Sequence, residues 1–215
     1  MYRYFIKRLL DIILSLIAII ILSPIILITA IMVRAKMGSP VLFCQDRIGK
    51  DEKIFKMYKF RSMTNACDKF GNLLSEEKRL TKFGKFIRST SIDELPELFS
   101  ILLGDMAIIG PRPLRACDLP YFKEEEREIH TVRGGLIPPD VLSGKAITSY
   151  EEQFEYERYY AINVSFILDI KVLFATFKVL LKRAKEDYGA AERPHLKDYR
   201  IDMRGYEDEI EQGNS

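Results

Sequence analysis

Two adjacent carboxylates, Asp93 and Glu94, lie between a cluster of cations and an apolar run, and this pattern fits chemistry on phosphate. Ser91 stands three residues before Glu94, a spacing that predicts a capping box at the start of a helix over about 95–103. Asp93 would then lie in the positive field of a helix N-terminus, which favours its ionised form. Such a carboxylate could act as a nucleophile, although acidic residues in a first turn often only complement the helix dipole.

Cations gather immediately before this pair. Residues 78–88 contain five Lys or Arg and no acid. Lys82, Lys85 and Arg88 recur every three residues, close to one helical face, so they could converge on a diphosphate. Arg88 is nearest to the carboxylates and could orient Asp93 or hold the phosphoryl group that it attacks.

Three further cations are candidate phosphate ligands. Lys59 and Arg61 lie at the end of a predicted strand. Arg112 stands between two prolines, which fix the backbone on both sides and present the guanidinium from a stiff loop. The candidate phosphate site therefore comprises Arg88, Arg112, Lys59, Arg61 and Lys85.

A predicted β-hairpin precedes this site. Apolar-rich runs at 41–45 and 53–60 flank a polar, glycine-containing loop at 46–51. Residues 34–61 hold eight Lys or Arg and three acids, a net charge of +5. This excess indicates a surface for anionic lipid headgroups or a phosphorylated substrate, with a solvated charged face as the alternative.

An apolar run from residue 9 to residue 33, with basic residues at both ends, predicts a membrane element. About 25 residues extend roughly 37 Å as a helix, enough for a bilayer core of about 30 Å and too long for a signal peptide. Ser23 and Pro24 lie in its middle, where the proline bends or breaks the helix. The pattern favours a re-entrant hairpin and leaves a kinked single span open. Asp11, near its start, could snorkel to the headgroups or pair with a neighbouring cation.

The second half of the chain contains a predicted amphipathic helix over 166–185. A stripe of lysines there opposes an apolar stripe, which indicates an interfacial helix or an ordinary core-packing one. The two stripes are Lys171, Lys178, Lys182 and Lys185, and Phe166, Leu173, Phe177 and Leu180. The preceding segment at 151–160 is typical of a solvated or packing face. Residues 186–215 form an acidic tail.

Composition excludes several classes of function. The 215 residues are 47% hydrophobic and 30% charged, with a net charge of +2, as in ordinary globular proteins. Three cysteines without a C-x-x-C pair and two histidines outside any metal-binding spacing argue against a disulfide framework and zinc chemistry. No pattern indicates nucleic-acid binding.

The ordered motifs of residues 5–115 resemble the bacterial sugar transferase family, the small monotopic phosphoglycosyl transferases that begin glycan assembly on a polyprenyl phosphate. The motifs are Lys7–Asp11, Ser23–Pro24, Asp46–Gly49, Tyr58–Met63, Leu80–Gly84, Thr90–Pro96 and Gly104–Pro113. The resemblance continues more loosely to about residue 185. It thins at 133–145, a glycine- and proline-rich loop, and the chain has no tryptophan.

The resemblance implies a UDP-sugar donor, an undecaprenyl phosphate acceptor and a Mg²⁺ cofactor held through Asp93. Asp93 would attack the sugar-bearing phosphorus and expel UMP, and Glu94 would support the site or manage the acceptor's proton. Arg88 and Arg112 would contact phosphate. The break at Ser23 and Pro24 would make the anchor re-entrant, on the cytosolic face of the bacterial inner membrane.

The expected architecture is a helix-dominated α+β fold with a short hairpin and amphipathic interfacial helices. It has a membrane anchor at 1–36, a catalytic domain at 37–185 and an acidic tail at 186–215. The partners expected besides substrates are lipids of the cytosolic leaflet, and a homo-oligomer is left open. The alternatives are a non-catalytic membrane-attached scaffold, or lipid-phosphate binding module, and a phosphohydrolase that uses Asp93.

Overall fold

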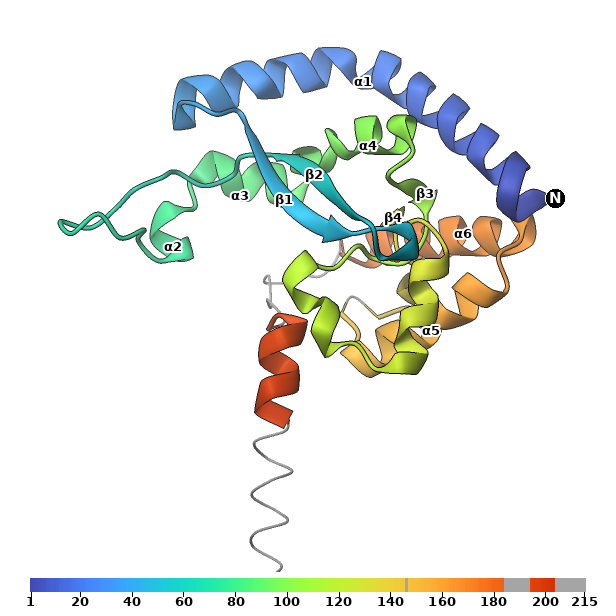
Figure 1. Ribbon diagram of the computed structural model, residues 1–215. Helices are drawn as coiled ribbons and strands as arrows, with labels where there is room; N and C mark the ends of the chain where they lie inside the picture. Colours follow the sequence, from blue (N-terminus) through green and yellow to red (C-terminus); the bar gives the residue numbers. More distant parts are fainter. Residues whose placement is uncertain (146, 184–193, 204–215) are drawn as a thin grey trace, which may run out of the picture. The chain divides into compact units, whose positions relative to one another are not determined.

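The computed structural model describes residues 1–145, 147–183 and 194–203. Helices dominate the fold, as predicted (Figure 1). The α-helices are α1 (Lys7–Met37), α2 (Glu76–Arg79), α3 (Lys82–Ser89), α4 (Glu97–Leu103), α5 (Tyr150–Ile162) and α6 (Phe166–Arg183). The strands are β1 (Leu42–Ile48), β2 (Ile54–Phe60), β3 (Ala107–Ile109) and β4 (Gly135–Ile137). They form two two-stranded sheets, β1 with β2 and β3 with β4.

The chain divides into two compact units. The first, called here the anchor unit, contains residues 4–46 and 55–108. The second, called the loop unit, contains residues 1–3, 47–54 and the described residues from 109 onward. The predicted catalytic carboxylates belong to the anchor unit, and Arg112 belongs to the loop unit.

The predicted hairpin is confirmed, with a shorter turn than expected. β1 continues to Ile48 because this side chain is buried and its N–H donates to the Leu114 carbonyl at 2.9 Å. Lys50–Glu52 form a single 3₁₀ turn between the strands. Asp51 and Glu52 both have a positive φ, which a tight reversal requires and which costs free energy for residues other than glycine.

The predicted break at Ser23 and Pro24 is absent, because α1 continues through both residues as it curves along its length (Figure 1). A proline inside a helix leaves the carbonyl four residues earlier without its N–H partner. Here that carbonyl belongs to Ile20, and it accepts a hydrogen bond from the Ser23 hydroxyl at 2.8 Å. Ser23 thus replaces the donor that Pro24 removes, and the helix does not have to end.

Both ends of α1 contact the rest of the anchor unit. Near the start, Arg8 donates to the carbonyls of Ile101 and Leu102 at 2.6 and 2.8 Å, at the C-terminal end of α4. Asp11 is buried and accepts the Ile108 N–H at 3.0 Å, so the prediction that it snorkels to the headgroups was wrong, while its pairing with a neighbouring cation stays a prediction. At the other end, Val33 and Met37 join a hydrophobic cluster with Phe60 and Ile87.

The outer face of α1 is apolar and exposed. In the described part of the chain, this is the one helix long and apolar enough to cross a membrane, judged by length and composition. Residues such as Ile17, Ile21 and Ile28 are about half exposed or more, which is costly in water and favourable in lipid. The finding fits membrane association.

The loop unit has its own core and carries α5 and α6. The core is formed by the buried side chains of Ile48, Leu114, Phe122, Ile129, Tyr150, Phe154 and Leu196. The predicted helix is confirmed as α6, which buries Leu168, Val172 and Val179 and exposes members of both predicted stripes, such as Lys171 and Phe177. The side chain of Lys182, Lys185 and most of the acidic tail lie outside the described residues.

Candidate functional site

The close approach of α3 to the strand end positions Arg88. The Thr81 hydroxyl caps α3 by accepting the Gly84 N–H at 2.9 Å. A Cβ at Gly84 would lie 1.8 Å from the Ser62 carbonyl oxygen, so this approach requires glycine. Arg88, on the last turn of α3, then donates through Nε to the Ser62 hydroxyl at 2.8 Å.

The predicted capping box at Ser91 is absent. Ser91 adopts a left-handed conformation, with φ of 53°, and its side chain makes no capping hydrogen bond. The chain must reverse within a few residues after α3, and a left-handed residue achieves this reversal. Ile92–Glu94 form a 3₁₀ turn, and α4 begins at Glu97 after Pro96, whose φ of −61° suits the entry to a helix.

Asp93 lies in the 3₁₀ turn and is mostly buried, with 9% of its surface exposed. Burial raises the pKa of Asp93 to about 6, the neighbouring charge of Glu94 adds to the rise, and Lys59 and Arg88 oppose it. The expectation that local helix geometry favours the ionised form was therefore wrong, because burial outweighs it. Asp93 nevertheless lies near two cations, Lys59 and Arg88, whose charges act on it.

Lys59 links the site's other carboxylates. Its ammonium lies 2.6 Å from Glu94 Oε1 and 3.1 Å from Glu97 Oε1. Burial alone would lower the pKa of Lys59, but the two carboxylates outweigh burial and raise it. The sequence prediction missed Glu97, which is buried on the first turn of α4. Its spacing of three residues from Glu94, at a helix start, was the available signal.

The remaining anchor-unit candidates differ in their surroundings. Arg61 is buried, and its guanidinium donates to the carbonyls of Pro40 and Met63 at 2.8 and 3.4 Å. It therefore ties two chain segments together, and phosphate binding by Arg61 stays a prediction. Lys85 is exposed on α3.

Arg112 lies in the loop unit, on a turn with buried prolines at 111 and 113. Its side chain is exposed, and its backbone N–H donates to Glu157 Oε1 at 2.8 Å. Glu157 comes from α5 and is completely buried. The sequence prediction described 151–160 only as a solvated or packing face, because nothing local to α5 signals a bond to a residue 45 positions away.

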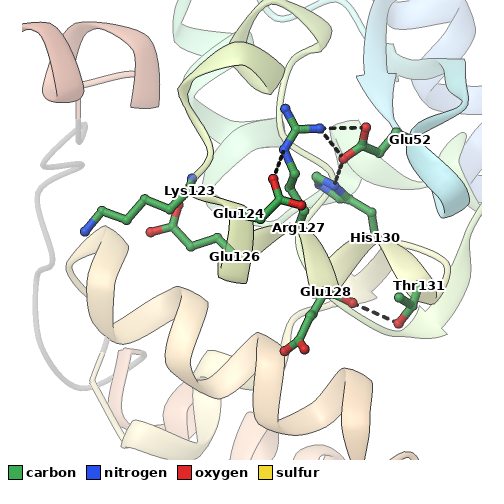
Figure 2. Close-up of polar contacts among 8 residues, drawn as sticks. All are labelled: Glu52, Lys123, Glu124, Glu126, Arg127, Glu128, His130 and Thr131. Carbon is green, nitrogen blue, oxygen red and sulfur yellow. Dashed lines mark hydrogen bonds and ion pairs between the residues drawn. The ribbon is translucent and has the colours of Figure 1, made fainter.

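A second polar cluster of the loop unit surrounds Glu52 (Figure 2). The Glu52 carboxylate accepts from Arg127 at 2.9 Å and lies 3.3 Å from His130 Nδ1. Burial lowers the pKa of His130, and Arg127 contributes in the same direction while Glu52 opposes it. These contacts hold the left-handed Glu52 backbone at the hairpin turn, and the sequence prediction did not include them.

The described residues contain no group of three or more His, Cys, Asp or Glu side chains arranged to hold a metal ion. Mg²⁺ in phosphate-binding sites commonly uses one or two carboxylates together with substrate oxygens. Asp93, with Glu94 beside it, fits that smaller requirement.

Comparison with known proteins gives one consistent match. Residues 2–183 match the family model described as bacterial sugar transferase. An uncharacterized sugar transferase of Bacillus subtilis is 44% identical over 81% of this chain and 87% of its own length.

Two relatives whose names state an activity are longer than this chain. The UDP-N-acetylgalactosamine-undecaprenyl-phosphate N-acetylgalactosaminephosphotransferase of Aeromonas hydrophila is 38% identical over 82% of this chain and 44% of its own length. The UDP-glucose:undecaprenyl-phosphate glucose-1-phosphate transferase of Klebsiella pneumoniae is 37% identical over 83% of this chain and 41% of its own length. The chain thus spans less than half of these two proteins.

Proposed function

The chain belongs to the bacterial sugar transferase family, and from this premise we propose that it transfers a phosphosugar from a UDP-sugar to a polyprenyl phosphate, releasing UMP. The observation that carries the proposal is Asp93, a mostly buried carboxyl with the cations Lys59 and Arg88 beside it. The named relatives support the substrate classes, since both names combine a UDP-sugar with undecaprenyl phosphate. Their sugars differ, so the donor's sugar is a property of each protein.

The proposed reaction has two steps. An oxygen of Asp93 attacks the sugar-bearing phosphorus of the donor, and the bond between that phosphorus and the bridging oxygen breaks, so UMP leaves. A phosphate oxygen of the polyprenyl acceptor then attacks the same phosphorus and releases the Asp93 carboxylate. A covalent intermediate divides one difficult transfer into two easier ones.

The surrounding side chains have separate proposed roles. Arg88 holds the phosphoryl group and is itself oriented by Ser62, with Nε to Oγ at 2.8 Å. Lys59 keeps Glu94 in place, at 2.6 Å, and its positive charge favours the ionised Asp93 that attack requires. Glu94 supports the site or receives the acceptor's proton. Lys85, exposed on α3, is a further proposed contact of the donor diphosphate.

Mg²⁺ is the proposed cofactor, held by Asp93 together with oxygens of the donor diphosphate. The metal would neutralise the charge that develops on those oxygens. Lys59 and Arg88 contribute positive charge from the protein in the same region. Arg112 supplies a guanidinium for phosphate from an exposed position on the loop unit.

The proposed location is the cytosolic face of the inner membrane, with α1 monotopic and re-entrant through the curve of a continuous helix instead of through a break at Ser23 and Pro24. Contacts at both ends of α1 support this, because a spanning helix would hold its ends on opposite sides of the bilayer. Arg8 and Asp11 contact α4 and β3, while Val33 and Met37 contact Phe60 and Ile87, all within the anchor unit.

The exposed apolar face of α6 supports a second proposed membrane contact. Phe166, Phe174 and Phe177 are each more than half exposed, and Lys171 and Lys178 of the same helix are exposed as well. An apolar face bordered by cations suits a helix that lies in the headgroup region.

The test of function is UMP release by the full chain in detergent with Mg²⁺ and a panel of UDP-sugars, with and without undecaprenyl phosphate. We expect a stoichiometric burst without acceptor, turnover with acceptor, and loss of both in Asp93→Asn. Asp105→Asn, which alters an exposed aspartate of the same unit, should behave as wild type. UMP release that continues without acceptor would instead indicate a hydrolase, and silence with every donor would favour a scaffold.

Topology is tested separately by labelling single cysteines at the two ends of α1. Tyr4→Cys and Ser39→Cys variants, with the three native cysteines replaced by serine, would be treated with an impermeant maleimide. Both positions should react in inside-out vesicles and neither in spheroplasts. Reaction of Tyr4→Cys from the outside would mean that α1 spans the membrane.

A further inference from the structure

The turn that carries Arg112 is held from one side by α5. Arg112 N–H donates to Glu157 Oε1 at 2.8 Å, and the Tyr160 hydroxyl, which also donates to Asp169 Oδ1 at 2.5 Å, shares its proton with the Ile109 carbonyl at 3.2 Å. Glu157 and Tyr160 lie three residues apart on α5, and both are completely buried. The helix therefore holds the backbone on both sides of the Gly110–Pro111 peptide.

β4 holds the same turn from another side. Gly135 N–H donates to the Pro111 carbonyl at 2.8 Å, and Gly110 N–H donates to the Ile137 carbonyl at 3.2 Å. A Cβ at Gly135 would lie 2.1 Å from the Gly110 nitrogen, so only glycine permits this contact. The backbone at 110–112 is thus fixed, while the Arg112 side chain is exposed.

Glu157 is an unusual residue for this task. Its Oε1 accepts a second hydrogen bond from Gln153 Nε2 at 3.0 Å, while Oε2 is buried and has no hydrogen-bond partner among the described residues. A carboxyl buried in this way costs free energy that an apolar side chain would not. The cost is explained if the bond to Arg112 N–H serves the reaction.

Burial determines the protonation of Glu157, and charged groups from two other segments modify it in opposite directions. Burial raises the pKa of Glu157 to about 8; Asp140 adds to the rise, while the N–H and the charge of Arg112 and the amide of Gln153 oppose it. Asp140 is itself held by the Thr148 hydroxyl at 2.9 Å. At pH 7 Glu157 is therefore neutral, and its Oε1 still accepts both hydrogen bonds.

We propose that Glu157 is a positioning residue for the transfer reaction: through its bond to the Arg112 backbone it sets the direction in which the Arg112 guanidinium meets the donor diphosphate. The inference rests on the proposed function and on Arg112 as a phosphate contact. The inference adds a residue from the core of the loop unit to the functional residues of the exposed turn. Glu157 touches no substrate and acts only through Arg112.

The test compares Glu157→Gln with Glu157→Leu in UMP release by the full chain. Glutamine keeps the acceptor oxygen and resembles the neutral acid, so kcat/KM should stay within about threefold of wild type. Leucine fills the space without an acceptor, and kcat/KM should fall by about 10- to 100-fold, as expected when a phosphate contact is misplaced. Glu155→Gln, an exposed change on the same helix, is the matched control and should have no effect.

A double variant separates positioning from general packing. If Glu157 acts through Arg112, adding Glu157→Leu to Arg112→Ala should cost less than about threefold beyond Arg112→Ala alone. Independent, multiplying losses would overturn the inference, as would wild-type activity of Glu157→Leu. Wild type that releases no UMP from any donor would instead refute the proposed function, so the two failures are distinguishable.

A second variant decides the matter if Glu157→Leu does not fold. Glu157→Asp keeps a carboxyl but shortens the side chain by one methylene, so its oxygen should no longer reach the Arg112 N–H, and kcat/KM should fall by at least about 10-fold while Glu157→Gln stays near wild type. Wild-type kcat/KM in Glu157→Asp would overturn the inference.

Discussion

Asp93 in the anchor unit and Glu157 in the loop unit are both buried carboxyls with a raised pKa, yet their surroundings differ. Asp93 keeps some exposure, and Lys59 and Arg88 oppose the rise. Glu157 is fully enclosed and accepts hydrogen bonds from N–H groups. A raised pKa therefore does not by itself identify a catalytic group. Accessibility of the carboxyl itself distinguishes the proposed nucleophile, which is 9% exposed, from the proposed positioning residue, which is 0% exposed.

The same chemical change at the two positions should give the largest contrast. Asp93→Asn removes the attacking oxygen's charge, so UMP release should fall by at least about 1,000-fold. Glu157→Gln should stay within about threefold of wild type, because the amide reproduces the neutral acid. The measurement is acceptor-dependent UMP release by both variants at pH 7. Comparable losses in the two would remove the distinction between the sites.

Replacing Lys59 should have the next largest effect. Lys59→Met leaves Glu94 and Glu97 without the shared ammonium at 2.6 and 3.1 Å, and it removes a charge that favours ionised Asp93. Activity should fall by about 100-fold. Lys56→Met, on the same strand but at an exposed ion pair with Asp46, is the control and should be nearly neutral. Equal losses of activity in the two variants would show that the total positive charge of β2 determines activity. The contacts of Lys59 with Glu94 and Glu97 would then not be responsible.

The stability of Asp93→Asn tests whether burial raises the pKa of Asp93 in the folded protein. The folded-state pKa of about 6 lies above the ordinary value of 3.8, so the folded state holds this proton more tightly. The stabilisation from the protonated Asp93 is lost as pH rises from about 4 to about 6. Above pH 6 the folded state bears the full cost of a buried, ionised carboxylate. In metal-free buffer at pH 7.5, Asp93→Asn should raise the free energy of unfolding by on the order of 1–2 kcal/mol.

Denaturant unfolding at pH 7.5 and pH 4.5 measures this effect. The advantage of Asp93→Asn should shrink at pH 4.5, where wild-type Asp93 is largely protonated in the folded state. An advantage that does not change with pH would mean that the substitution acts by packing and not by removing a charge.

Ser62→Ala should give the smallest effect. It removes the hydroxyl that accepts from Arg88 Nε at 2.8 Å, a single hydrogen bond worth about 1 kcal/mol or roughly fivefold in kcat/KM. Ser89→Ala, where the hydroxyl only bonds back to the Phe86 carbonyl of its own helix, is the matched control. If both variants equal wild type, Arg88 is oriented by other contacts.

Local patterns predicted much of the fold, and long-range packing accounts for what they missed. The hairpin, helix α6 and the basic helix before Asp93 follow from residue periodicity and turn chemistry, so sequence was sufficient for these elements. The left-handed backbone of Ser91 follows from the need to reverse the chain after α3. No residue type at this position predicts that conformation. Burial of Asp93 depends on the rest of the anchor unit, so the argument from the helix terminus alone predicts the wrong direction for its pKa.

Residues of the candidate site that are close together in sequence were predicted, and those that depend on long-range contacts were missed. The Asp93–Glu94 pair and its cations stand close together in sequence, and the structure gives Lys59 a direct contact with Glu94. Glu97 was visible only as a spacing along a helix, and Glu157 was not visible, because its partner is 45 residues away. Residues that act through backbone contacts leave little trace in composition or motif.

The hydrogen bond from Ser23 to the Ile20 carbonyl makes the order of substitutions at this dipeptide matter. If Pro24 is replaced first by alanine, the new N–H can serve the carbonyl and the serine becomes dispensable. If Ser23 is replaced first, the carbonyl faces hydrocarbon with no donor, which is costly in lipid. Replacement of Pro24 before Ser23 is therefore tolerated more readily during evolution than the reverse order. Homologues that keep only the serine should outnumber those that keep only the proline.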